Sequence, residues 1–309
     1  MDNGRIKLNY MRTIFAGFGF LSVMMFWQVY DAIVPLILKN TFALGETVIG
    51  AIMAIDNVSA IVLLPIAGVL SDRLATRWGR RIPVMIPGTI LGGACLFGMA
   101  LFDSLGSFAG FMIALAVGVI AMGTYRVCTV SLMPDITPKP FRSQANGIIN
   151  LMGGIGGIIM LFAIQQLAPE GENLNYMPLF TFGAVGMVLF VVACAVLVNE
   201  PKAVLRMREE SIKLGIQEEE QPPRDGRAGR ALSGMDPAVR KSFLFMLATI
   251  FFFIAAFNGF STFASLYFTT MFGISLAQFA NIMILLQLIA IIAYLPVGCW
   301  QAGWAGKRR

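Results

Sequence analysis

The sequence predicts an all-α integral membrane protein, a bundle of helices that each cross a lipid bilayer. Hydrophobic residues make up 57% of the chain and charged residues only 13%, whereas soluble domains carry about 25% charged residues. The mean hydropathy is +0.76. The apolar residues also fall in long runs, and a helix of about 20 apolar residues is enough to span a bilayer.

A short basic loop fixes the expected orientation of the chain. Between two apolar runs lie Asp72, Arg73, Arg77, Arg80 and Arg81. Moving arginine across a membrane is costly, so short Arg-rich loops stay cytoplasmic. All of the 23 Lys and Arg residues except Lys39 and Arg126 fall in segments expected on this same side. We therefore expect an even number of spans, both termini in the cytoplasm, and a place in the plasma (inner) membrane.

Six membrane-spanning helices are expected in residues 1–198, the N-terminal half. Their ranges are 13–38, 46–71, 82–102, 108–133, 142–167 and 176–198. Pro65 is expected to kink the second helix. The glycines of the third helix, Gly88 and Gly92, and those at 153–157 of the fifth predict close helix packing. For the second group, an opening of the backbone to a substrate remains an alternative.

Residues 199–238 change character and predict a cytoplasmic linker. The segment is charged, contains Pro201, Pro222 and Pro223, and is expected to be helical only near 202–214, with its charges in water. Asp236 and Pro237 form a suitable N-cap and first position for the next helix, expected at 237–271. An eighth helix follows at 276–303, so residues 239–309 carry helices 7 and 8 of an incomplete C-terminal half.

Three charged residues are expected within the membrane, namely Asp31, Asp56 and Arg126. A charge at this depth is costly and marks a functional site more often than a structural one. A carboxylate that is buried beside a cation can carry a proton. The depths of the three residues along their helices place Arg126 nearer to Asp56 than to Asp31. We therefore expect the three to form a proton-coupling site.

Other polar or aromatic residues in the spans are candidates for binding a substrate. They are Trp27, Gln28, Tyr30, Asn150 and Asn258. A sugar needs hydrogen-bonding side chains and an aromatic platform, which these residue types supply. Hydrogen bonding or packing between helices is the alternative role for each of them.

Several functional classes lack the residues that they need. The chain has no histidine, and its four cysteines are scattered through apolar runs, so neither a metal site nor a disulfide is expected. No phosphate-binding loop is present. The net charge of +6 follows from the basic loops and is no sign of nucleic-acid binding. We expect no cofactor and no enzymatic activity.

Two segments carry a resemblance to a known family. The sequence DRLATRWGRRIP, residues 72–83, resembles the loop between helices 2 and 3 in the major facilitator superfamily. Its fuller form is similar to the glycoside–pentoside–hexuronide cation symporters and the related sucrose–proton symporters. Residues 133–157 resemble the helix 4–5 region of bacterial members.

The resemblance implies a secondary transporter whose two halves rock about a central substrate site. It also implies that the loop forms a cytoplasmic gate, made by Asp72, Arg73, Arg77, Gly79, Arg80 and Arg81. Members of the melibiose-permease-like branch have two carboxylates on helix 2, whereas Asp56 stands alone here. We therefore expect protons rather than sodium as the coupling ion. The family fold has twelve helices and eight are expected here, so we expect a C-terminally truncated transporter.

The leading prediction is a sugar–proton symporter that works by alternating access. Its partners would be a small-molecule substrate, expected to be a sugar, together with protons and the lipid bilayer. One alternative is an efflux transporter for an amphipathic compound, which the aromatic residues and methionines in the spans would allow. Another alternative is a truncated membrane protein that transports nothing.

Overall fold

The computed structural model describes residues 8–74, 76–169, 175–215 and 236–306, with side chains as far as residue 292 except that of residue 62. These residues form helices and no strand, which confirms the expected fold class. The helices are α1 (Tyr10–Asn40), α2 (Glu46–Arg73), α3 (Ile82–Ser104), α4 (Phe108–Ile136), η1 (Lys139–Phe141), α5 (Arg142–Leu167), α6 (Met177–Leu197), α7 (Glu200–Lys213), α9 (Pro237–Phe272) and α10 (Leu276–Gly306).

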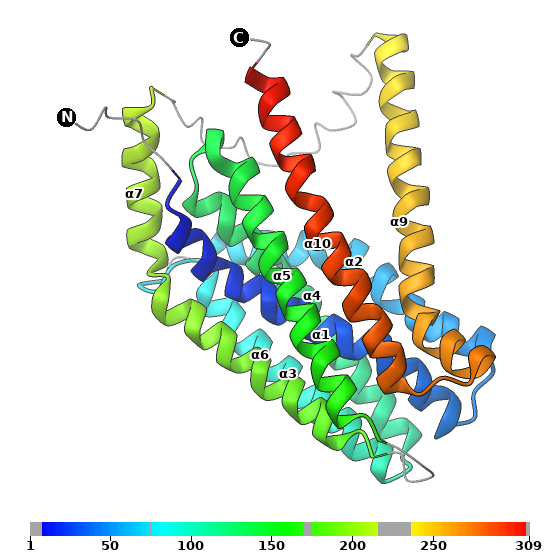
Figure 1. Ribbon diagram of the computed structural model, residues 1–309. Coiled ribbons are helices and arrows are strands. Elements are labelled where there is room, and N and C mark those ends of the chain that lie inside the picture. Colours follow the sequence, from blue (N-terminus) through cyan, green and yellow to red (C-terminus); the bar gives the residue numbers. More distant parts are fainter. Residues whose placement is uncertain (1–7, 75, 170–174, 216–235, 307–309) are drawn as a thin grey trace.

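Membrane-spanning length is a property of most of these helices. Six of the described helices are long and apolar enough to cross a bilayer, and the bent helix α2 makes a seventh. The ends of these helices, and those of α10, lie within three residues of the ranges expected from the sequence. Helix α1 begins and helix α10 ends at the same end of the bundle (Figure 1). We call this the basic-loop end, because residues 72–74 and 76–81 lie there, and we call the other the distal end.

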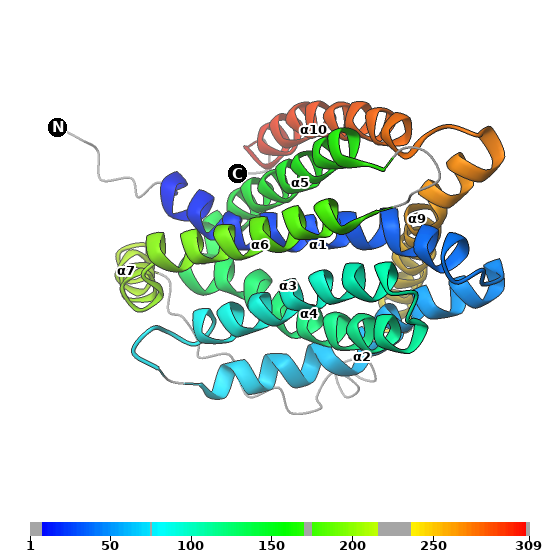
Figure 2. The ribbon, with the colours of Figure 1, turned by 90° about the horizontal axis from the view of Figure 1, so that it is seen from below.

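Helix α1 is the centre of the bundle. It packs against α4, α5, α6 and α9, and α3 packs in turn against α4 and α6. Figure 2 shows α1 and α6 between α5 on one side and α3 and α4 on the other, with α10 and α2 outermost. More of the apolar part of α1 is buried than that of any other described span, at 78%. The residues of α1 are therefore the ones that can reach every neighbouring helix.

Glycines allow the closest of these approaches, between α1 and α5. A Cβ atom on Gly156 would lie 2.3 Å from the main-chain oxygen of Leu21. On the facing helix, a Cβ atom on Gly17 would lie 2.6 Å from the side chain of Met152. Small residues let helix backbones approach in this way within membranes. The close packing expected of the 153–157 glycines is thus present at Gly156.

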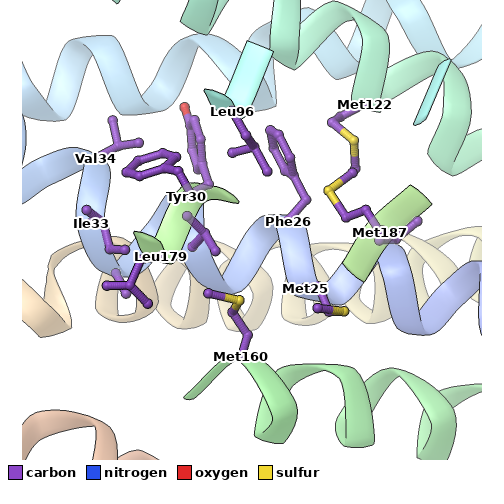
Figure 3. Close-up of a cluster of buried hydrophobic side chains, with 14 of the residues drawn as sticks. Met25, Phe26, Tyr30, Ile33, Val34, Leu96, Met122, Met160, Leu179 and Met187 are labelled. Carbon is purple, nitrogen blue, oxygen red and sulfur yellow. The ribbon is translucent and has the colours of Figure 1, made fainter. Parts of the chain in front are cut away.

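The core beneath this crossing is rich in methionine and aromatic side chains. Figure 3 shows Phe26 and Tyr30 of α1 beside Leu96, Met122 and Met187, which come from three other helices. Unbranched methionine side chains fill irregular gaps between such rings. The cysteines Cys95, Cys128 and Cys194 are also buried, and none of the three is in a disulfide.

Helix α2 is bent by 41° between Ile61 and Leu63. A proline ring clashes with the carbonyl group four residues earlier and removes one helical hydrogen bond. For Pro65 this carbonyl group belongs to Ile61, so the bend lies where the expected kink of Pro65 would place it. The bend separates the half of α2 that holds Asp56 from the half that enters the basic loop.

Helix α7 differs from the expectation that the charges after residue 199 lie in water. Its residues Glu200, Ala203 and Met207 are buried against the bundle, and the helix packs on α4. The carboxylate of Glu210 also pairs with the guanidinium of Arg12 on α1 at 2.9 Å. The expectation was wrong for Glu200 and for the partly buried Glu210, because successive turns of α7 present one face to the bundle. The other charged residues of α7 are exposed as expected, namely Lys202, Arg206, Arg208, Glu209 and Lys213. Residues 216–235 lie outside the described part.

Helix α9 meets the bundle near its distal end. Its buried residues are Ala264, Ser265 and Leu266, whereas Phe251, Phe252 and Phe253 are exposed. The Ser265 hydroxyl lies 3.5 Å from the main-chain oxygen of Asp31. Figure 1 shows α9 running away from the other helices toward the basic-loop end.

The close crossing of α1 and α5 gives a first prediction. The variant Gly156→Ala would push a methyl group into the backbone of α1, so it is expected to lower the free energy of unfolding by about 1–3 kcal/mol. Thermal unfolding of the purified protein in detergent measures the effect. Gly154→Ala is the matched control, since its Cβ atom would meet Ile291 at 3.4 Å and Gln287 at 3.5 Å, which are ordinary contacts. Equal stability of the two variants would contradict the assigned crossing.

Candidate functional site

A small cavity lies between α1, α2 and α4. Its polar lining consists of Trp27, Asp56, Asn57 and Arg126, and the remaining lining residues are Ala60, Leu63, Leu64, Val119 and Gly123. Its volume is about 30 Å³. A water molecule needs about 10–15 Å³ of such volume, so the cavity in this conformation suits one or two water molecules rather than a sugar.

Asp56 and Arg126 occupy the cavity without forming an ion pair. One oxygen of Asp56 accepts hydrogen bonds from the main-chain nitrogen of Asn57 at 2.6 Å and from its side-chain nitrogen at 2.8 Å. Arg126 forms no ion pair with any residue that the structure describes. Its guanidinium instead lies 5.9 Å from the ring centre of Trp27, a cation–π contact. The two opposite charges still attract each other across the cavity.

Asp31 lies beside this group rather than in it. The charge of Asp56 acts on the Asp31 carboxylate. Asp31 is half-buried on α1 and is not among the residues that line the cavity. The structure thus places Arg126 with Asp56 in one cavity and leaves Asp31 outside its lining.

Two hydrogen-bond donors near the cavity are unused. Within the described part of the chain, the indole nitrogen of Trp27 and the hydroxyl oxygen of Tyr30 are buried without a partner. The two rings lie edge to face with their centres 5.4 Å apart. Tyr30 also stacks on Phe26 at 5.9 Å, and Figure 3 shows its hydroxyl at the far tip of the side chain. Buried polar groups are usually satisfied, so these two donors are available to a ligand or to water.

The other predicted substrate residues lie elsewhere. The amide oxygen of Gln28 approaches Gly157 of α5, since a Cβ atom there would be 3.6 Å away. Asn150 is exposed on α5 and does not line the cavity. Asn258 of α9 approaches the cavity from outside, and its side-chain nitrogen lies 3.5 Å from the side-chain oxygen of Asn57. Asn57 was not among the substrate residues predicted from the sequence, although its position next to Asp56 was a usable signal.

A second charged cluster occupies the basic-loop end, around Arg81. Its guanidinium donates to Asp135 at 2.8 Å and to the hydroxyl of Ser71 at 2.8 Å, and it pairs with Asp72 at 2.6 Å. Burial alone lowers the pKa of the Arg81 guanidinium, but the nearby carboxylates of Asp135 and Asp72 outweigh burial and raise its pKa above the ordinary value. Among the expected gate residues, the structure thus brings Arg81 and Asp72 together.

The remaining arginines of the loop are less engaged. Arg73, Arg77 and Arg80 are exposed, and the guanidinium of Arg80 lies 3.8 Å from Asp135. Asp135 was not among the expected gate residues. It stands in the MPD segment at the end of α4, so an acidic residue at the end of an apolar run was the available signal.

Glu200, at the start of α7, holds the same loop by its backbone. Its carboxylate accepts hydrogen bonds from the main-chain nitrogens of Arg80 at 2.7 Å, Arg81 at 3.0 Å and Ile82 at 3.1 Å. These are orphan donors at the N-terminus of α3, where a negative charge is also favourable. Gly79 has φ +106°, and a Cβ atom there would lie 2.2 Å from Glu200. The glycine is therefore needed for its conformation and for its small size.

Two comparisons with known proteins bear on this arrangement. Residues 16–309 match the model of the family described as the Major Facilitator Superfamily. A general alpha-glucoside permease from Schizosaccharomyces pombe is 27% identical over 176 residues, which make up 50% of this chain and 31% of that protein. The aligned part of the chain thus spans about a third of the length of that relative.

The contacts of Glu200 give a second prediction. The variant Glu200→Ala leaves three main-chain donors, two of them buried, without an acceptor. It is therefore expected to lower the free energy of unfolding by about 1–3 kcal/mol. Glu209→Ala, which removes an exposed carboxylate from the same helix, is the control and is expected to change little. Thermal unfolding in detergent measures both variants, and an equal loss in the two would show that Glu200 does not hold the loop.

Proposed function

Because the chain belongs to the Major Facilitator Superfamily, a family of membrane transporters, we propose that it carries a sugar together with protons across a membrane. The observation that carries the proposal is the group formed by Asp56, Arg126 and Trp27 around one cavity inside the bundle. The likeness to an alpha-glucoside permease supports a sugar as the substrate.

The proton site is proposed at Asp56 and Asp31. Charges within membrane spans are costly and are retained mainly where they serve transport or a proton path. The two carboxylates are close enough to repel each other, and such a pair can hold one proton between them. Arg126 faces Asp56 and is proposed to compensate its charge when the proton leaves.

The sugar site is proposed beside this group, toward Trp27 and Tyr30. Sugar-binding sites combine an aromatic face with a few well-placed donors and acceptors. The unpaired Trp27 nitrogen and Tyr30 hydroxyl are such donors. Since the cavity of about 30 Å³ is too small for a sugar, the substrate is proposed to enter in a conformation in which the helices around it have moved apart.

The gate is proposed at the basic-loop end, which we assign to the cytoplasm by the positive-inside rule. Arg81, Asp72 and Asp135 fasten the loop to α2 and α4, while Glu200 fastens it to α7. We propose that residues 1–198 form one half of the transporter, 199–238 a cytoplasmic linker, and 239–309 part of the second half. Rocking of the halves would then alternate access to the central site.

A flux measurement tests sugar–proton symport directly. In proteoliposomes that contain the protein and a pH-sensitive dye, addition of an alpha-glucoside outside is expected to drive protons inward. Liposomes without protein, and the same protein given a non-sugar solute, are the controls. Proton movement that is coupled to the export of amphipathic compounds would favour the efflux alternative instead. Sugar uptake without any proton movement would remove the coupling from the proposal.

Asp56 supplies a sharper prediction. The variant Asp56→Asn is expected to lose accumulation of sugar against a gradient but to keep exchange of labelled for unlabelled sugar, because exchange needs no net proton movement. The control is Asp103→Asn, which alters a carboxylate of α3 that accepts a hydrogen bond from Thr41 at 2.7 Å and does not line the cavity. Unchanged accumulation in Asp56→Asn at equal expression would exclude Asp56 from the coupling.

A further inference from the structure

The side chain of Asn57 forms a bridge between Asp56 and helix α9. Its nitrogen Nδ2 donates to Asp56 at 2.8 Å, and its oxygen Oδ1 lies 3.5 Å from Nδ2 of Asn258. Asp56 and Asn57 belong to α2, whereas Asn258 is 201 residues away along the chain. One amide group thus touches both the candidate proton carrier and a helix from the other part of the bundle.

The direction of this bridge depends on the charge of Asp56. An ionised carboxylate can only accept hydrogen bonds, whereas a side-chain amide has one accepting and one donating end. While Asp56 is ionised, Asn57 must turn its nitrogen to the carboxylate. Its oxygen then faces α9 and can accept from the nitrogen of Asn258.

A proton on Asp56 removes this constraint. The neutral carboxyl group has an O–H donor of its own, so the oxygen of Asn57 can turn to Asp56 as an acceptor. The nitrogen of Asn57 would then face the nitrogen of Asn258, and these two donors cannot bond to each other until the Asn258 amide also turns over. The contact is already 3.5 Å long, near the limit for a hydrogen bond, so little is needed to break it.

Charged and titratable groups from other helices also act on Asp56. Asp31 and Tyr30 approach it from α1, and Arg126 approaches from α4. From the described part of α9 the approaching group is Asn258, which is uncharged. These neighbours set when Asp56 takes up a proton, and Asn57 is the group that passes the change on to α9.

We propose that Asn57 is a positioning residue that transmits the protonation state of Asp56 to α9. Protonation of Asp56 would weaken the contact between Asn57 and Asn258, and so release α9 from α2. Helix α9 holds to α1 nearby through Ala264, Ser265 and Leu266. Release at Asn258 would therefore loosen the contact between α9 and the rest of the bundle near the distal end. The inference rests on the proposed role of Asp56 as a proton carrier.

A distance measurement in lipid tests the proposal. Nitroxide labels at Val48→Cys on α2 and Met271→Cys on α9 report on the distal ends of both helices, where the two native side chains are 49% and 69% exposed. The four native cysteines are replaced by alanine. In the otherwise unchanged protein, the distance between the labels is expected to increase as the pH is lowered, while Asp56→Asn holds it at the low-pH value at every pH.

Two variants remove the bridge from either side. Asn57→Ala and Asn258→Ala are each expected to abolish the pH response of the distance, and the second serves if the first does not fold. The matched control is Ser261→Ala, which changes a polar residue three positions further along α9 and is expected to keep the response. A wild-type response in both asparagine variants would overturn the proposal, and so would a distance that is independent of pH in the unchanged protein.

A third variant tests the direction of the hydrogen bond. Asn258→Asp places an acceptor where Asn258 has a donor, so the contact should now form when Asp56 is protonated. The pH response is expected to reverse in sign, and an unreversed response would overturn the proposal. Sugar uptake of the same variants separates this inference from the proposed function. If proton-coupled uptake persists and the pH response of the distance does not depend on Asn57, the bridge alone is refuted. If the pH response depends on Asn57 but the protein takes up no sugar, sugar transport alone is refuted.

Discussion

The cost of placing a charge inside a membrane governs most of this structure. It accounts for the collection of nearly all basic residues in segments assigned to one side, and for the few charges that remain within the spans. Of these, Asp56 and Arg126 turn to a common cavity instead of outward, and Asp31 lies beside them. The proposed proton site rests on these three charges.

Helix α1 makes this interior possible. It is buried along most of its length because glycines, above all Gly156 on the facing helix, let α5 approach its backbone closely. Trp27, Tyr30 and Asp31 all belong to α1. The aromatic platform and one carboxylate of the candidate site are therefore built into the most tightly packed helix. Helix α9, by contrast, packs on the bundle over a short stretch and leaves most of its length exposed.

The two charged clusters, around Arg81 and around Asp56, differ in how their charges are paired. At the basic-loop end Arg81 and Glu200 are both engaged, since Arg81 has two carboxylate partners and Glu200 accepts from three successive main-chain nitrogens. Around Asp56 the charges are held apart, because Asp56 bonds to Asn57 and Arg126 lies over Trp27. The first arrangement stabilises one conformation. The second keeps Asp56 and Arg126 out of an ion pair, which fits the proposed coupling role.

The sequence by itself determined the fold class, the helix ranges to within three residues, the bend before Pro65, and the identity of the charges inside the spans. These follow from hydropathy, proline chemistry and the cost of buried charge, which are local properties of the chain. Only the tertiary structure decided which polar groups meet. It joined Glu200 to Arg80 across 120 residues and Asn57 to Asn258 across 201, and it left Asn150 exposed. Such pairings depend on how closely two helices cross and which faces they turn to each other. Small side chains at the crossing points set that geometry, and residue spacing along one helix carries no record of it.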